Sequence, residues 1–73
     1  MKYLLIKTDG YSIETEGFLS EADCYKSMLD AYNAAKPEEW DESFEDMSYI
    51  SETDAILYAN GEEVFVWRII SVK

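Results

Sequence analysis

The sequence predicts an α+β fold, with one amphipathic helix packed on one face of a small antiparallel sheet and the element order ββαβββ. Two pairs of apolar runs are separated by Asp9-Gly10 and by Asn60-Gly61, dipeptides typical of hairpin turns. Between the pairs, residues 21–35 have the apolar spacing of a helix. With 73 residues, we expect residues 1–73 to form a single domain.

The first hairpin joins a short apolar strand, Tyr3–Thr8, to an alternating segment, Tyr11–Glu16. Alternation with period two is typical of an edge strand with one covered face. It predicts inward side chains at Tyr11, Ile13 and Thr15 and outward side chains at Ser12, Glu14 and Glu16. Gly17 is expected to end this strand.

The helix is expected to begin after Ser20, whose hydroxyl can accept a hydrogen bond from the Asp23 N–H, and to stop before Lys36-Pro37. One helix of this length covers one face of a small sheet. The apolar spacing predicts a buried stripe of Ala22, Tyr25, Leu29 and Tyr32, flanked by Met28 and Ala35.

The C-terminal half is expected to hold three strands, which begin at Met47, Ala55 and Glu63, with a turn at Ser51–Asp54. The last strand is apolar on both faces, so it is predicted to lie in the middle of the sheet beside Tyr3–Thr8. Val64, Val66, Ile70 and Val72 form one face of that strand, and Phe65, Trp67 and Ile69 form the other.

The second face needs a cover, because a large apolar patch in water is unusual for a monomer. Two alternatives could cover the face formed by Phe65, Trp67 and Ile69. Either residues 37–46 fold over it with Trp40 and Phe44 as anchors, or a second copy covers it in a homodimer.

The acidic residues are concentrated in the C-terminal half of a chain whose net charge is −10. Between Pro37 and Trp67 there is no lysine, arginine or histidine, but there are ten carboxylates: Glu38, Glu39, Asp41, Glu42, Glu45, Asp46, Glu52, Asp54, Glu62 and Glu63. Such charge argues against direct binding of nucleic acid or an anionic membrane and favours a basic protein partner.

Residues 38–46 allow two interpretations, an acidic loop pinned by Trp40 and Phe44 or a short helical turn with both rings on one face. Six like charges disfavour compact local structure, so a pinned loop with some helical turn is favoured. Asp41–Asp46 also offers hard oxygen ligands, but the EF-hand pattern and its glycine are absent, which disfavours a dedicated calcium site.

The residue inventory argues against an enzyme and against a cofactor. The chain has no histidine, which excludes histidine-based catalysis, and its one cysteine, Cys24, is interpreted as a packed helix residue. Carboxylate catalysis of the glycosidase type requires a substrate cleft, and a chain of 73 residues has little volume for one. The free thiol, the short apolar start and the lack of a 20-residue apolar run predict a cytoplasmic protein.

The leading hypothesis is therefore a non-enzymatic interaction module that binds or inhibits a basic, nucleic-acid-binding protein, in the manner of a DNA mimic. Its candidate surface comprises the ten carboxylates with Trp40 and Phe44, and the acidic turns are expected to gather at one end of the sheet. The alternatives are a small soluble regulatory or cation-binding domain, and a charge that serves solubility alone.

Residues 54–69 (DAILYANGEEVFVWRI), together with the start MKYLLIKTDG, resemble small acidic proteins of Gram-positive gut bacteria and their mobile elements. That set has no assigned activity, so the resemblance implies no role for any residue. A mobile-element origin implies an accessory role, such as blocking a host nucleic-acid enzyme.

Overall fold

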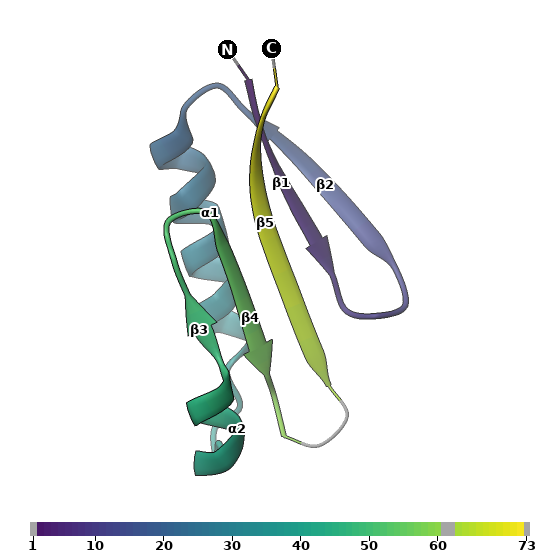
Figure 1. Cartoon of the computed structure of the whole chain (residues 1–73), viewed down its shortest axis with the longest axis vertical. Helices are drawn as coiled ribbons and strands as arrows, with labels where there is room; N and C mark the ends of the chain where they lie inside the picture. Colours follow the sequence, from purple (N-terminus) through teal and green to yellow (C-terminus); the bar gives the residue numbers. More distant parts are fainter. Residues whose placement is uncertain (1, 61–62, 73) are drawn as a thin grey trace.

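A computed structural model of the chain describes residues 2–60 and 63–72, and it shows an α+β fold with a five-stranded antiparallel sheet. The strand order is β2-β1-β5-β4-β3, and Figure 1 shows α1 lying along one face of the sheet. A second helix makes the element order ββααβββ, where a single helix was predicted. The elements are β1 (Lys2–Thr8), β2 (Ile13–Phe18), α1 (Glu21–Ala35), α2 (Glu42–Met47), β3 (Tyr49–Ile50), β4 (Asp54–Tyr58) and β5 (Val64–Val72).

The prediction that the last strand is central is confirmed, because β5 pairs with β1 on one side and with β4 on the other. A central strand has a neighbour on each side, and a strand that is apolar on both faces is typical of this position. The β1–β5 pairing aligns Lys2 with Val72 and Thr8 with Val66. The two hairpins are thus joined into one sheet through β5.

The first hairpin is confirmed, and a local hydrogen-bond pattern explains its turn. The Asp9 carboxylate accepts hydrogen bonds from the N–H groups of Tyr11 (2.9 Å) and Ser12 (3.0 Å). Gly10 has φ of +94°, a conformation that residues with a Cβ rarely adopt.

The predicted facing of β2 is wrong. The strand starts at Ile13 and continues through Gly17 to Phe18, and its register places Glu16 opposite Leu5. Glu14 and Glu16 therefore lie on the helix side, and Ile13 and Thr15 lie on the other side. The hairpin turn fixes this register, which outweighs the apolar alternation within one short strand.

Helix α1 begins as predicted, with the Ser20 hydroxyl accepting a hydrogen bond from the Asp23 N–H (3.3 Å). Its buried residues are Cys24, Met28 and Tyr32, which are spaced four apart and lie on one stripe. The predicted stripe is partly wrong, because Ala22 is exposed. The helix is rotated toward Cys24 and Met28, of which Met28 was predicted at the flank of the stripe.

The core lies between α1 and the sheet, with Trp67 at its centre and 0% exposed. The Trp67 ring centroid lies 5.8 Å from that of Tyr32 and 6.0 Å from that of Phe65. The buried residues are Leu5, Cys24, Met28, Tyr32, Ala55, Leu57, Ala59 and Trp67.

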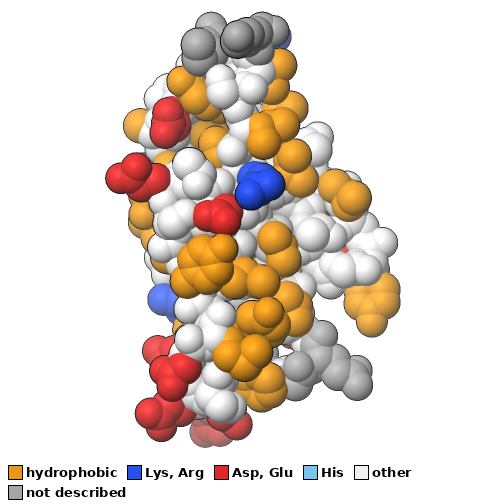
Figure 2. All heavy atoms as spheres, in the orientation of Figure 1, with side chains coloured by type: hydrophobic (Ala, Val, Ile, Leu, Met, Phe, Trp, Pro, Cys, Tyr) orange, Lys and Arg blue, Asp and Glu red, His pale blue; other side chains and the backbone are white. Residues whose placement is uncertain are grey.

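This packing corrects the prediction of which sheet face needs a cover. Phe65, Trp67 and Ile69 lie under α1. Because the helix covers these side chains, neither a second copy nor residues 37–46 is needed to cover them. Trp40 packs against the same core as the helix does. The uncovered face is the opposite one, which Figure 2 shows with many apolar side chains.

The second hairpin joins β4 to β5, with the Ala59 N–H donating to the Glu63 carbonyl oxygen (2.8 Å). Asn60 has φ of +28°, within the left-handed region that asparagine tolerates in turns. Gly61 and Glu62 lie outside the described residues, so the predicted Asn60-Gly61 turn is described at Asn60 only.

Candidate acidic interaction surface

Residues 38–46 contain a capped helix, in place of the predicted pinned loop with some helical turn. The Asp41 carboxylate accepts hydrogen bonds from the Ser43 N–H (3.0 Å) and the Ser43 hydroxyl (2.8 Å), which lower the pKa of Asp41. The Asp41 carbonyl oxygen accepts from the N–H groups of Phe44 and Glu45. A charged cap, with Glu42 in the first turn, favours a helix despite the repulsion between carboxylates.

Two side chains hold the segment before α2 against the end of β4. The Trp40 indole N–H donates to the Tyr58 carbonyl oxygen at 2.7 Å. The Asn60 side chain accepts from the Asp41 N–H (2.9 Å) and donates to the Glu39 carbonyl oxygen (2.7 Å). The pinning by Trp40 was predicted, and the clamp by Asn60 was not.

Ser48 holds the other end of α2. Its hydroxyl donates to the Phe44 carbonyl oxygen (2.9 Å) and accepts from the Tyr58 N–H (2.8 Å). Because β3 has only two residues, the outer edge of β4 has no strand partner at Tyr58. Ser48 and Trp40 occupy the N–H and the carbonyl oxygen of that residue, which protects the edge from pairing with another chain.

The carboxylates of this segment point into solvent. Figure 2 shows acidic side chains gathered at the end of the molecule where α2 lies. We call this region the acidic end, and it comprises Glu38, Glu39, Asp41, Glu42, Glu45 and Asp46, all exposed. Phe44 is half-buried, and Glu63 is exposed at the same end of β4 as Asn60.

Glu52 and Asp54 do not join the acidic end, so the prediction that the acidic turns gather at one end is wrong. The turn at residues 51–54 precedes β4, and the turn at residues 59–63 follows it. The two turns that flank one strand lie at its opposite ends. Glu52 lies beside the start of α1, near Glu21 and Tyr25. Glu62 lies outside the described residues.

Asp54 is part of a local hydrogen-bond network. Its carboxylate accepts from the Ser51 hydroxyl and from the Tyr49 hydroxyl (3.0 Å), and these bonds lower its pKa below 3.8. The Ser51 N–H also donates to the Asp54 carbonyl oxygen (2.7 Å), which confirms the predicted turn. This carboxylate stabilises a turn and is not free for a partner.

We expect Asp54→Asn to lower the free energy of unfolding at pH 7 and to do so by less at about pH 2.5, which is below the ordinary pKa of 3.8. The pKa of Asp54 is lower in the folded state than its ordinary value of 3.8. Its stabilisation is therefore fully present above that value and is lost as the pH falls through the folded pKa. Urea unfolding at both pH values measures the deficit. A deficit of equal size at pH 7 and pH 2.5 would contradict the prediction, and Glu52→Gln is the exposed control.

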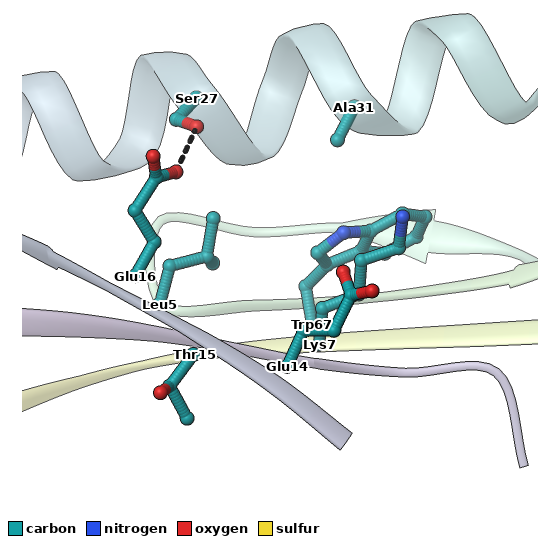
Figure 3. A pocket seen from close by; sticks show the side chains of 8 residues that line it. All are labelled: Leu5, Lys7, Glu14, Thr15, Glu16, Ser27, Ala31 and Trp67. Atoms are coloured by element: carbon teal, nitrogen blue, oxygen red, sulfur yellow. Dashed lines mark hydrogen bonds between the residues drawn. The ribbon is translucent and has the colours of Figure 1, made fainter. Parts of the chain in front are cut away.

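A hollow of about 580 Å³ lies between α1 and the β1–β2 hairpin (Figure 3). Glu14 and Glu16 flank it, and the Glu16 carboxylate accepts a hydrogen bond from the Ser27 hydroxyl (3.4 Å). The Trp67 indole N–H, at the floor, is buried without a hydrogen-bond partner. Sequence reasoning missed this hollow because it placed both glutamates on the outer face of β2.

Cys24 is fully buried in the core, and burial raises the pKa of its thiol. This confirms the interpretation of Cys24 as a packed helix residue. Within residues 2–60 and 63–72, no three acidic or cysteine side chains are arranged to hold a metal ion. The helices in this part of the chain are too short or too polar to cross a membrane.

Comparison with protein-family models, with curated proteins and with solved structures finds no match.

Proposed function

We propose that this chain is a non-enzymatic interaction module that binds a basic protein through its acidic end. The observation that carries the proposal is the way in which the acidic end is held. Trp40, Asn60 and Ser48 fix the backbone of residues 39–48 against β4, while the carboxylates of Glu38, Glu42 and Glu45 stay exposed.

A fixed backbone matters because it keeps the carboxylates at constant separations. A flexible acidic tail must lose conformational entropy when it binds, whereas a preorganised surface loses less. A protein groove that binds nucleic acid is lined by lysine and arginine at phosphate spacing, so a rigid array of carboxylates can occupy it. Such a complex should weaken with salt, because exposed charges are screened over about 8–10 Å.

Three aspartates already have local structural roles. Asp9, Asp41 and Asp54 have lowered pKa values, each because local N–H or hydroxyl groups donate to the carboxylate. These three carboxylates stabilise turns and a helix start, and the other exposed acids remain for binding.

The aromatic anchors predicted for the interface need revision. The Trp40 ring packs against the core and its indole N–H is used internally, so it shapes the surface without being offered to a partner. Phe44 is half-buried on α2. Binding through the acidic end therefore depends on charge more than on a buried aromatic side chain.

The test compares two triple variants with the same change in net charge. Glu38→Gln, Glu42→Gln and Glu45→Gln neutralise the acidic end, and Glu14→Gln, Asp30→Asn and Glu52→Gln neutralise exposed acids elsewhere. We expect the first triple to weaken binding of a basic nucleic-acid-binding protein by roughly 10- to 100-fold, at about 0.5–1 kcal/mol for each charge. The second triple should change binding by less than about threefold.

The readout is capture of basic proteins from a lysate on the immobilised chain at low and at high salt. Duplex DNA added in solution should release the captured proteins, because it competes for the same groove. An equal loss of binding in both triple variants would show that binding depends only on net charge, and it would overturn the proposal. Capture that is insensitive to salt would do the same.

A further inference from the structure

The sheet face opposite α1 has no cover within the described chain, and we call it the open face. Ile13 is 73% exposed on it, and none of its apolar residues belongs to the core or packs against it. Figure 2 shows apolar side chains extending over much of this face. They are Leu4, Ile6, Ile13, Ile56, Val64, Val66, Ile70 and Val72, which the strand registers place on the same side.

The open face is depleted of acidic residues in a chain that has sixteen of them. The only charged residues that the strand registers place on it are Lys2, Asp54 and Arg68. A basic partner would find one carboxylate here, and that carboxylate is already hydrogen-bonded to Tyr49 and Ser51. We propose that a second copy of this chain covers the open face, in a symmetric dimer with its two sheets packed face to face.

The shape of the face is complementary to itself. At one end, a hollow of about 320 Å³ is lined by Leu4, Gly17 and Val72, among others. Gly17 contributes no side chain, and a Cβ placed there would come within 3.8 Å of Leu4. At the other end of β2, Ile13 protrudes. A two-fold axis across the strands places Ile13 of each copy over the hollow of the other.

The charges of the face also suit this symmetry. Ile6, Arg68 and Asp54 lie in one row across the strands, midway along the face. An axis along this row places Arg68 opposite Arg68 of the partner and Asp54 opposite Asp54 of the partner, so the four charges sum to zero and each Arg68 lies beside Asp54 of its own chain. The same axis sends the two acidic ends to opposite ends of the dimer, which keeps their repulsion small.

The size of the face matches what a stable dimer needs. The five strands are 2 to 9 residues long and lie about 4.8 Å apart, which gives a patch roughly 20 Å on each side. Because side chains protrude from the sheet, the surface that such a patch buries is larger than its flat area, at roughly 600–800 Å² per copy. A standard stable interface buries about 800 Å² per copy. Two sheets packed in this way stack about 10 Å apart.

Sedimentation velocity from about 1 to 200 µM tests the dimer, and we expect the wild type to reach twice the monomer mass within this range. Ile13→Glu should raise the dissociation constant at least about 100-fold, because it places an unpaired carboxylate in the hollow of the partner. Ile13 is well exposed in one chain, so the variant should still fold. Ala34→Glu adds the same charge to the exposed side of α1 and should leave the dimer unchanged.

A second measurement tests the axis. Arg68→Cys places a thiol beside the two-fold axis, so a short thiol-reactive crosslinker with two reactive ends should link two chains across the roughly 10 Å between the sheets. Cys24 is fully buried and should not react, and Ala34→Cys is the control without a partner. A wild type that stays monomeric at about 200 µM overturns the proposal and leaves the face to a different chain. Equal effects of Ile13→Glu and Ala34→Glu, or equal linking of the two cysteine variants, also overturn it.

Discussion

Trp67→Ala will leave the chain largely unfolded at 25 °C. The Trp67 side chain is 0% exposed and lies at the centre of the core, against the rings of Tyr32 and Phe65. Removing a buried tryptophan costs about 3–5 kcal/mol, through lost apolar burial and the cavity left behind. A single core in a chain of this size supplies only about 3–5 kcal/mol in total. The loss therefore equals the whole stability.

Near-ultraviolet circular dichroism and urea unfolding measure this effect. Trp67→Phe keeps an aromatic ring in place and also removes the buried indole N–H that has no acceptor, so it should remain folded. Tyr11→Ala removes a ring that is 96% exposed and should change the free energy of unfolding by less than about 0.5 kcal/mol. A cooperative transition in Trp67→Ala, with a loss below about 1 kcal/mol, would show that Trp67 does not organise the core.

Trp40→Ala will release the acidic end while the sheet stays folded. Trp40 contributes both its packing against the core and the 2.7 Å hydrogen bond to the Tyr58 carbonyl oxygen. We expect a loss of about 2–3 kcal/mol in the free energy of unfolding, less than for Trp67 because Trp40 is only half-buried. Trp40→Phe removes mainly the hydrogen bond and should cost about 1 kcal/mol.

Amide hydrogen exchange distinguishes local release from general loss of stability. The N–H groups of Phe44, Glu45 and Ser48 are hydrogen-bonded within the α2 segment, and we expect their exchange to quicken at least about tenfold beyond any global change. The Ile69 N–H, bonded to the Thr53 carbonyl oxygen, should follow global stability alone. Equal acceleration at all four amides would mean that α2 is not an independently opening segment.

Trp40→Ala also bears on the proposed function, because it changes no charge. If rigidity of the acidic end matters, this variant should bind a basic partner more weakly than the wild type at the same low salt. Binding equal to that of the wild type would indicate that the carboxylates act through net charge alone.

Features controlled by neighbouring residues in the sequence were predicted correctly. Asp9-Gly10 predicted the first hairpin, Ser20 the start of α1, and the two-sided apolar pattern of residues 63–72 the central strand. Each depends on a backbone preference or a burial requirement that the local sequence carries. The pinning of residues 38–46 by Trp40 was also predicted from the local sequence, because a single tryptophan among acidic residues is expected to pack against the rest of the protein.

Features controlled by three-dimensional pairing were predicted wrongly. The last strand is apolar on both faces, so its sequence could not indicate which face α1 would cover, and Trp67 was assigned to the uncovered one. The register of β2 places Glu14 and Glu16 on the helix side against the local pattern. Capping of α2 by Asp41 was not predicted because all six carboxylates of residues 38–46 were treated as mutually repulsive, although a carboxylate at a helix start is favourable.

The candidate site was predicted as one surface and is divided by the topology. Glu52 precedes β4 and Asp54 begins it, whereas the acidic end lies where β4 finishes. Asp41 and Asp54 stabilise local structure, which residue type alone does not reveal, since an aspartate that caps a helix and one that binds a partner look alike in a sequence. The hydroxyl groups of Ser43 and Ser51 donate to Asp41 and Asp54. A serine so close in the sequence is the signal that could have distinguished these structural aspartates from acids that are available to a partner.

The pairing of β1 with β5 has a consequence for how quickly this chain folds. Lys2 lies opposite Val72, so the central pairing of the sheet closes a loop of almost the whole chain. Closing long loops costs entropy before the contacts stabilise them, and folding rates fall as contacts become more distant in sequence. The β1–β2 hairpin and α1 contact each other, but Ala55, Leu57 and Trp67 of the core come from β4 and β5. Despite its small size, the chain should therefore fold in one slow, concerted step, with its strands exposed to other chains until that step is complete.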